Sequence, residues 1–243
     1  MTALDVNPLR RTARFAGFLY LLWTLTAMYG LIYVQSKTIV KGDAAATANN
    51  ILNNEFIFRT GILNGVVSSV LWVLIALTLY RLFRHVNEWH AKCLIALVIV
   101  QVPVVFFTEA MSLTALMLVK GEILHTFPLN EKQDLALFLF RMNDHATIAL
   151  EMFWGLWLIP FGILVYKSGF IPKILGVFLL LNAMAYVIHF LTHILLPDYA
   201  DIVFKIATPI WTLGEISIML WLLIKGIKSN YFPQSTIPGV AAT

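Results

Sequence analysis

Residues 60–83 read TGILNGVVSSVLWVLIALTLYRLF, an apolar run that holds no acidic residue and a single basic one, Arg81, near its end. An α-helix needs about 20 mainly apolar residues to cross the hydrocarbon core of a bilayer, which is roughly 30 Å thick. Transmembrane β-strands would instead alternate in polarity over about 10 residues. The run is therefore predicted to be a membrane-spanning helix.

Other runs of this kind lie on both sides of it, from Phe15 to Val34, Cys93 to Val119, Leu135 to Tyr166, Ile171 to Leu196 and Ile202 to Ile227. The composition agrees, because 60% of the residues are hydrophobic and 12% are charged. These values exclude a soluble globular protein and a disordered chain, and the lone cysteine excludes a disulfide scaffold. The sequence predicts an all-α fold, a polytopic transmembrane helical bundle of six spans.

The fourth run is too long for one perpendicular crossing, since at 1.5 Å per residue it would measure about 48 Å. Either its helix is strongly tilted, or residues 135–142 lie along the membrane interface. The second interpretation is favoured here, because Arg141, Asn143, Asp144 and His145 cluster where such a bend would reach the surface. The crossing is then predicted to begin near Asn143.

Basic residues lie between the apolar runs and near their ends instead of forming one cluster. This distribution excludes nucleic-acid binding and leaves the lipid bilayer as the expected partner. One side of the predicted bundle collects Arg10, Arg11, Arg14, Arg81, Arg84, Lys92, Lys167, Lys173, Lys225 and Lys228. The other collects only Lys37, Lys41, Arg59, Lys120, Lys132 and Lys205. Both termini are therefore predicted to be cytoplasmic, in a multi-pass protein of the bacterial cytoplasmic (inner) membrane; the oligomeric state stays open.

Three regions follow from this reading. Residues 1–14 are predicted to be a basic cytoplasmic N-terminus, residues 15–228 the six-span domain, and residues 229–243 a flexible tail with two prolines. Residues 43–54, DAAATANNILNN, are predicted to form a short helix on the outer side, because Asp43 is a good N-cap before an Ala-rich segment.

Four acidic residues fall inside predicted spans: Glu109, Asp144, Glu151 and Glu215. An ionisable side chain within a membrane is costly, and those that persist usually face the bundle interior and mark a functional site. The predicted topology places the three glutamates at similar depth, from the membrane middle to its outer half. Almost nothing polar lies in the inner half.

Helical spacing groups these acids with other polar residues. On the fifth span Asn182, Tyr186, His189 and His193 follow one another by four, three and four residues, so they share one helix face. Similar stripes on other spans predict a polar cavity that opens outward. Its predicted ligand-binding residues are Arg59, Asn64, Glu109, Asp144, Glu151, Tyr186, Trp211 and Glu215.

Two other interpretations remain open. The polar groups could instead hydrogen-bond across helices as packing contacts, and Arg59 could lie at the outer interface with its charge in water. The pair His189 and His193 has metal-ligand spacing, so a zinc hydrolase is conceivable, with Asp144 or His145 as third ligand. The catalytic Glu of the HExxH pattern is absent between the two histidines. No cofactor other than this zinc is expected.

Several stretches resemble a bacterial membrane family known as domain of unknown function 4386. They are RRTARFAGFLYLL, SKTIVKGDAAATANNIL with the following FRTGI, EMFWGLWLIPFGILVYKSGFIPKILGV and GEISIMLWLLIKGIK. The resemblance extends from about Asn7 to Lys228 and implies a polytopic helical membrane protein without an assigned activity. Arg59, Glu109, Glu151 and Glu215 fall inside the resembling pattern, whereas His145, His189 and His193 do not.

The leading hypothesis from the sequence is a protein that binds or transports a small amphiphilic or cationic molecule in an outward-facing cavity. It requires Glu109, Glu151 and Glu215 to converge on a common space. The alternatives are the intramembrane metal-dependent hydrolase and a non-catalytic membrane scaffold. No motif assigns an enzymatic reaction.

Overall fold

The computed structural model describes residues 6–228, and these residues form helices and connecting turns without any β-strand. The α-helices are Val6–Met28 (α1), Gln35–Thr38 (α2), Ala44–Asn53 (α3), Glu55–Phe83 (α4), Glu88–Ile99 (α5), Val102–Val119 (α6), Leu129–Lys167 (α7), Lys173–Leu195 (α8) and Ala200–Ile224 (α9). A π-helical segment, Tyr29–Val34, joins α1 to α2, and a 3-10 turn, Pro197–Tyr199, joins α8 to α9. Six helical stretches of the described residues are long and apolar enough to cross a membrane, so the protein is an all-α, six-span membrane bundle.

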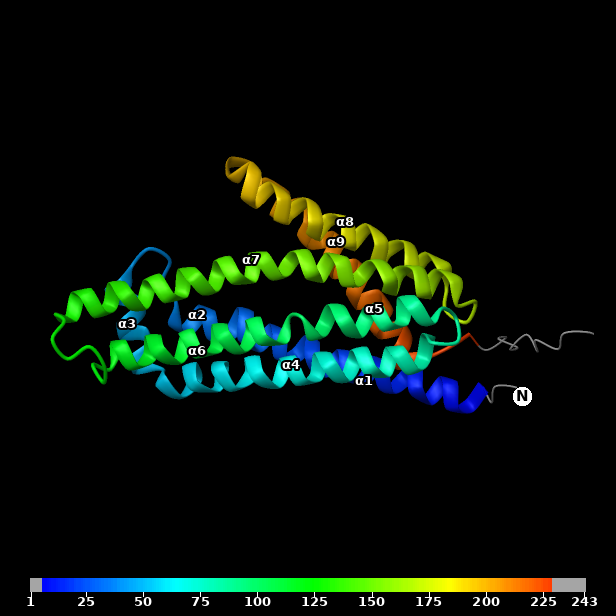
Figure 1. The fold of residues 1–243 in the computed structure, drawn as a ribbon, viewed down its shortest axis with the longest axis horizontal. Helices are drawn as coiled ribbons and strands as arrows, with labels where there is room; N and C mark the ends of the chain where they lie inside the picture. The colour runs from blue at the N-terminus through cyan, green and yellow to red at the C-terminus, as the bar shows by residue number, and fades with distance from the viewer. Residues whose placement is uncertain (1–5, 229–243) are drawn as a thin grey trace, which may run out of the picture.

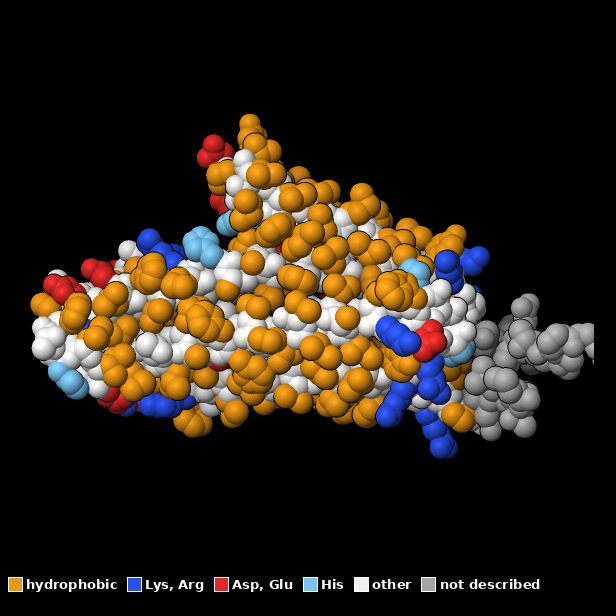
Figure 2. All heavy atoms as spheres, viewed as in Figure 1, with side chains coloured by type: hydrophobic (Ala, Val, Ile, Leu, Met, Phe, Trp, Pro, Cys, Tyr) orange, Lys and Arg blue, Asp and Glu red, His pale blue; other side chains and the backbone are white. Residues whose placement is uncertain are grey.

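The long helices run along one another (Figure 1), and their contacts close a ring of spans. Helix α1 packs against α4 and α9, α4 packs against α5 and α6, and α7 joins these two helices to α8, which packs against α9. The first and last described helices meet at one end of the bundle, where the guanidinium Nη2 of Arg14 donates a hydrogen bond to the carbonyl of Ile224 at 3.0 Å. Most blue side chains in Figure 2 gather near that end, which is called the basic end below, and the opposite end is called the far end.

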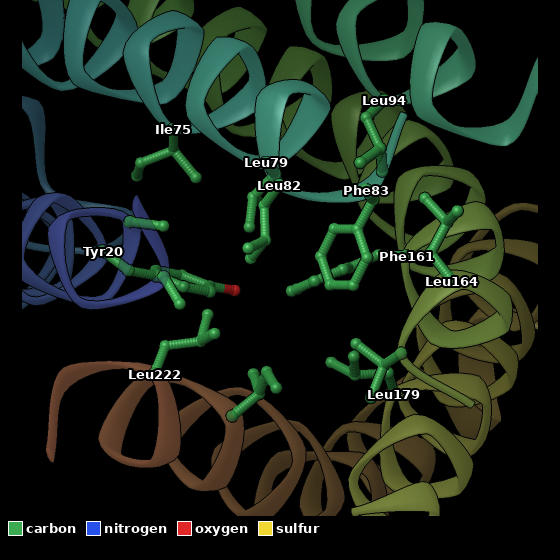
Figure 3. Close-up of a cluster of buried hydrophobic side chains, with 14 of the residues drawn as sticks. Tyr20, Ile75, Leu79, Leu82, Phe83, Leu94, Phe161, Leu164, Leu179 and Leu222 are labelled. Carbon is green, nitrogen blue, oxygen red and sulfur yellow. The ribbon is translucent and has the colours of Figure 1, made fainter. Parts of the chain in front are cut away.

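Apolar side chains fill the centre of the ring in its basic half (Figure 3). Those that point inward and are fully buried include Leu79, Leu82, Phe83, Phe161, Leu179 and Leu222, called the apolar plug below. They come from α4, α7, α8 and α9, and the hydroxyl oxygen of Tyr20 on α1 points toward the same centre. The ring is therefore closed by hydrocarbon at its basic end.

Small residues allow the helices of this half to approach closely. A Cβ added at Gly162 on α7 would lie 2.9 Å from the carbonyl oxygen of Gly176 on α8, and one at Gly155 would lie 2.9 Å from that of Ala183. A Cβ at Gly17 on α1 would overlap the backbone of Leu223 on α9. Such small-residue contacts are typical of helix packing in membranes, where van der Waals contact replaces the hydrophobic effect.

A second apolar cluster lies at the far end, where α3 packs across the ends of the long helices. It joins Ile51 of α3, Phe58 of α4, Leu116 of α6 and Phe140 of α7. The rings of Phe58 and Phe140 meet edge to face with centroids 5.8 Å apart. Helix α3 corresponds to the short helix predicted at 43–54.

Helices α8 and α9 form a hairpin that diverges from the rest of the bundle toward the far end (Figure 1). In the basic half α8 packs closely on α7, but its outer part rises away while α7 continues along the bundle. Figure 2 shows the resulting notch between the hairpin tip and the body of the molecule. The far half of the ring is therefore less tightly closed than the basic half.

The prediction of a bend near Asn143 is wrong, because α7 is one continuous helix of 39 residues. Residues 135–142 stay helical in line with the rest since Ala136 and Phe140 bury one face of this segment in the far-end cluster. The amide Nδ2 of Asn143 donates to the hydroxyl of Ser112 on α6 at 3.2 Å, which also holds α7 against its neighbour.

Two irregularities in the spans were not predicted. The third span is broken between α5 and α6, where Val100 and Gln101 form a turn and Pro103 stands in the first turn of α6. Proline lacks an amide hydrogen and clashes with the carbonyl four residues earlier, so it favours such a break. Helix α1 begins at Val6, inside the region 1–14 that was predicted to precede the first span. The predicted tail at 229–243 lies outside the described residues.

Replacing Asp43 with alanine is expected to destabilise α3 by about 1 kcal/mol. Its carboxylate accepts a hydrogen bond from the backbone nitrogen of Ala46 at 2.8 Å, which satisfies an amide in the first turn. Amide hydrogen exchange in residues 44–53 should become faster in this variant, whereas Asp43→Ser should retain protection. Equal exchange rates in both variants would contradict a capping role.

Candidate functional site

Glu215 lies on the side of α9 that faces the interior of the ring, and three side chains donate hydrogen bonds to it. The hydroxyl of Tyr20 on α1 donates to Oε2 at 2.8 Å, and the hydroxyl of Tyr186 on α8 donates to Oε1 at 3.1 Å. The amide Nδ2 of Asn182, one turn before Tyr186, lies 3.5 Å from the same Oε1. Helices α1, α8 and α9 are thus joined at one carboxyl group.

Further aromatic side chains pack beside both tyrosines. On one side Tyr20 lies 6.1 Å from the ring of Trp72 on α4, which lies 4.6 Å from Trp157 on α7. On the other side Tyr186 stacks on Trp211 of α9 with centroids 4.5 Å apart and planes 9° from parallel. Glu215 is therefore placed between two aromatic groups that come from five helices.

Four buried polar atoms of Asn182 and of the tryptophans that continue from the two tyrosines have no hydrogen-bond partner within residues 6–228. They are the indole Nε1 atoms of Trp72, Trp157 and Trp211 and the Oδ1 atom of Asn182. More than nine in ten buried polar groups in proteins are hydrogen-bonded, so four unpartnered atoms within one connected set of side chains are unusual. Three of the atoms are donors and one is an acceptor.

Glu151 is the second predicted glutamate, and it pairs with a predicted metal ligand. Its Oε2 lies 2.5 Å from Nδ1 of His189 on α8, and both side chains are almost completely buried. The His189 ring also lies 5.5 Å from that of Trp211, edge to face. Because Trp211 stacks on Tyr186, this pair and Glu215 are connected through one continuous set of contacts.

Glu109 is not part of this set. It projects from α6 toward α4, where a Cβ on Gly65 would overlap its carboxyl group. No hydrogen bond from Glu109 to another side chain is found among the described residues. The structure therefore brings Glu151 and Glu215 together through α8 and α9, and it places Glu109 against another helix.

The remaining predicted ligand-binding residues lie apart from Glu215. Arg59 pairs with Glu55 at 2.7 Å near the far end, and Lys120 reaches the same carboxylate at 3.1 Å. The carboxylates of Glu122 and Glu55 raise the pKa of the Lys120 ammonium. Arg59 thus belongs to an exposed charge network and is not a counter-charge for the membrane glutamates.

Asn64 and Asp144 also have other surroundings. The amide Nδ2 of Asn64 on α4 donates to the carbonyl of Thr26 on α1 at 2.9 Å, which is a packing contact between neighbouring helices. Asp144 is exposed on the far half of α7. Neither residue contacts the Glu215 group.

The predicted zinc site is not assembled in the part of the chain that the structure describes, where no group of three His, Cys, Asp or Glu side chains is placed to hold a metal ion. The rings of His189 and His193 lie 6.1 Å apart, and His189 uses its Nδ1 atom for Glu151. A zinc requirement stays a prediction that solution measurements can test.

Two surface hollows among the described residues are apolar and differ from the predicted polar cavity. One, of about 350 Å³, runs between α8 and α9 on the outside of the ring, from Val203 to Gly214 along α9. A smaller one lies between α5 and α7 beside His90 and Cys93. Both face the region that lipid occupies around a membrane bundle.

Sequence reasoning missed Tyr20, Trp72 and Trp157 as members of the Glu215 group. Tyr20 could have been found from the spacing of the first span, since Gly17, Tyr20 and Thr24 lie on one helix face and all contact α9. The two tryptophans carry no charge and resemble ordinary apolar filling in the sequence. Only the ring arrangement shows that they meet beside Tyr20.

Comparison with known proteins gives a family and no activity. The family described as "Domain of unknown function (DUF4386)" matches residues 15–226, which is nearly the whole chain. No curated protein and no solved structure matches the chain. The chain therefore belongs to the DUF4386 family of membrane proteins.

Proposed function

We propose that this protein binds a small organic cation of amphiphilic character at Glu215. The observation that carries the proposal is a carboxyl group in the bundle interior that receives hydrogen bonds from Tyr20 and Tyr186 and is paired with no Lys, Arg or His side chain among the described residues. An ionised carboxylate within a membrane is costly unless a positive charge neutralises it. A bound cation would provide that charge.

The aromatic surroundings favour an organic cation over a metal ion. Cations are attracted to the faces of tryptophan and tyrosine rings, and aromatic cages recognise quaternary ammonium groups in this way. Rings of Tyr20, Trp72, Tyr186 and Trp211 lie around the Glu215 carboxyl or pack against its hydrogen-bond partners. A metal ion would instead require several carboxylate, imidazole or thiolate ligands.

The shape of the bundle supports ligand entry from the far end. The apolar plug fills the ring between Glu215 and the basic end, while the α8–α9 hairpin diverges from α7 toward the far end (Figures 1 and 3). By the distribution of basic residues, the far end is expected to face outward from the cytoplasmic membrane of a bacterium. Binding is therefore proposed to occur from the outer side.

Glu151 and His189 support the site without contacting Glu215. Their buried pair lies about one turn beyond Tyr186 and Trp211, and the His189 ring contacts that of Trp211. The pair joins α7 to α8 about one turn beyond the close approach of Gly155 to Ala183. In this proposal it positions the stacked Tyr186 and Trp211 rings that form one wall of the cation site.

Binding of radiolabelled tetraphenylphosphonium tests the proposal. The purified protein is incorporated in phosphatidylglycerol nanodiscs, and binding is corrected for empty nanodiscs. Loss of the Glu215 charge in Glu215→Gln should weaken binding at least tenfold, which corresponds to about 1.4 kcal/mol. Glu109→Gln is the matched control, because it removes a membrane carboxyl group that lies outside the aromatic group.

The outcome distinguishes several hypotheses. Weakened binding in Glu215→Gln with unchanged binding in Glu109→Gln supports the proposed site. Equal binding by the wild-type protein and both variants, or no binding above empty nanodiscs, overturns it and favours the scaffold hypothesis. Tetraphenylphosphonium uptake by proteoliposomes against a concentration gradient would extend the role from binding to transport.

A further inference from the structure

We propose that the ligand at Glu215 carries an oxygen acceptor beside its cationic group, as choline esters and phospholipid headgroups do. This inference rests on the proposed cation site and specifies its ligand. It follows from the unpartnered indole donors that continue from the two tyrosines bound to Glu215, which a simple cation would leave unsatisfied. The expected ligand thus combines an ammonium group with an ester or phosphate oxygen a few atoms away.

Two of these donors lie on the Tyr20 side of the carboxyl group. The indole rings of Trp72 and Trp157 pack together at 4.6 Å, and their Nε1 atoms are buried without an acceptor in residues 6–228. Trp157 is 1% exposed and Trp72 is 8% exposed, so bulk water does not hydrate them. Trp72 also contacts Tyr20, whose hydroxyl donates to Glu215.

The third donor lies on the opposite side. The Nε1 atom of Trp211 is also buried and unpartnered, and its ring stacks on Tyr186, the second tyrosine that donates to Glu215. The backbone carbonyl of Trp211 accepts from Nδ2 of Asn182, whose Oδ1 atom has no donor among the described residues. Unpartnered polar atoms therefore lie on the side of each tyrosine that donates to the carboxyl group.

The energetics favour an acceptor in the ligand. A buried donor left without a partner is destabilising, and Glu215 does not relieve this cost because it accepts from two tyrosines and an asparagine. Indole N–H groups only donate, so their partner must contain an acceptor, for which an ester or phosphate oxygen is suited. A ligand with both groups would neutralise Glu215 and satisfy at least one indole.

An ammonium group with a nearby ester or phosphate oxygen occurs both in lipids and in small water-soluble molecules. Large apolar side chains are exposed on the hairpin at the far end, among them Leu195, Phe204 and Ile206, which are 69%, 48% and 61% exposed. An alkyl chain attached to the ligand could contact such a surface. The presence or absence of a tail therefore separates the two sources experimentally.

Competition against tetraphenylphosphonium in the same nanodiscs tests the inference. Lauroylcholine offers a quaternary ammonium, an ester and a tail, dodecyltrimethylammonium lacks the ester, and propionylcholine lacks the long tail. One hydrogen bond of about 1 kcal/mol predicts that lauroylcholine binds about fivefold more tightly than dodecyltrimethylammonium, after correction for partitioning into empty nanodiscs. Tighter binding of lauroylcholine than of propionylcholine would indicate a lipid-derived ligand, and equal binding a water-soluble one.

Phenylalanine variants identify the donor, because they remove an indole N–H and keep an aromatic ring. We expect the fivefold preference for the ester to be lost, so that both probes bind about equally, in one of the variants Trp157→Phe, Trp72→Phe and Trp211→Phe. Trp221→Phe is the matched control. Its Nε1 atom is also buried and unpartnered, but it lies nearly two turns beyond Glu215 toward the basic end.

The results separate failure of this inference from failure of the cation site. Loss of the ester preference in one of the three variants, with the preference kept in Trp221→Phe, supports the inference. Equal competition by the ester and non-ester probes, with both lost in Glu215→Gln, leaves the cation site intact and overturns the inference. An ester preference that persists in all three variants also overturns it.

Discussion

Replacing His189 with leucine is expected to lower the free energy of unfolding by about 3 kcal/mol, because it leaves the Glu151 carboxyl buried without its partner. The two side chains are 2.5 Å apart and 4% and 8% exposed, so water cannot replace the imidazole. Thermal unfolding in detergent micelles, followed by tryptophan fluorescence, measures the change. The midpoint should fall markedly.

Two comparisons show whether the effect arises from the pair. In the double variant Glu151→Met with His189→Leu, both polar groups are gone, and most of the lost stability should return. His193→Leu is the control on the same helix face, because His193 has no hydrogen bond among the described side chains and is only half-buried. Equal destabilisation by His189→Leu and His193→Leu would contradict a specific role for the pair.

Replacing Gly17 with valine is expected to cost about 3 kcal/mol in stability and to weaken tetraphenylphosphonium binding about fivefold or more. Any Cβ at this position overlaps the backbone of Leu223, so α1 and α9 must separate. Tyr20 lies one turn further along α1 and donates to Glu215 on α9. Separation of the two helices would therefore also pull one donor away from the carboxyl group.

Ala110→Val is the matched control, because it adds the same kind of bulk to an exposed position of α6, a helix that packs on α4, α5 and α7. It should change neither the unfolding temperature nor binding. Tyr20→Phe separates the two expected effects of Gly17→Val, since it removes the donor without displacing the backbone. If Gly17→Val binds like the wild type, contact between α1 and α9 is not required for the site.

The regular parts of the fold were predictable because each span is decided by local composition. Six apolar runs, the charge difference between the two ends and the Asp43 cap are all properties of contiguous residues, and the structure contains the six spans. The family resemblance is confirmed by the match over residues 15–226. The break before Pro103 also had a local signal that the length of the apolar run concealed.

The candidate site was predicted less completely because it depends on which helices are neighbours. Spacing along α8 correctly grouped Asn182, Tyr186 and His189 on one face, but it did not show that Tyr186 meets Glu215 or that His189 meets Glu151. Depth alone put Glu109 with the other glutamates, although α6 directs it toward Gly65 of α4. Similar depth is thus a weak guide to contact in a ring of six spans.

The unequal lengths of α7 and α8 have a consequence for the surrounding lipid. At 1.5 Å per residue the 39 residues of α7 extend about 58 Å, whereas the 23 residues of α8 extend about 35 Å. Since the two helices pack together near the basic end, a bilayer of uniform thickness cannot match both. Lipids beside the hairpin are expected to thin or tilt locally, so thicker membranes should strain this side of the protein first.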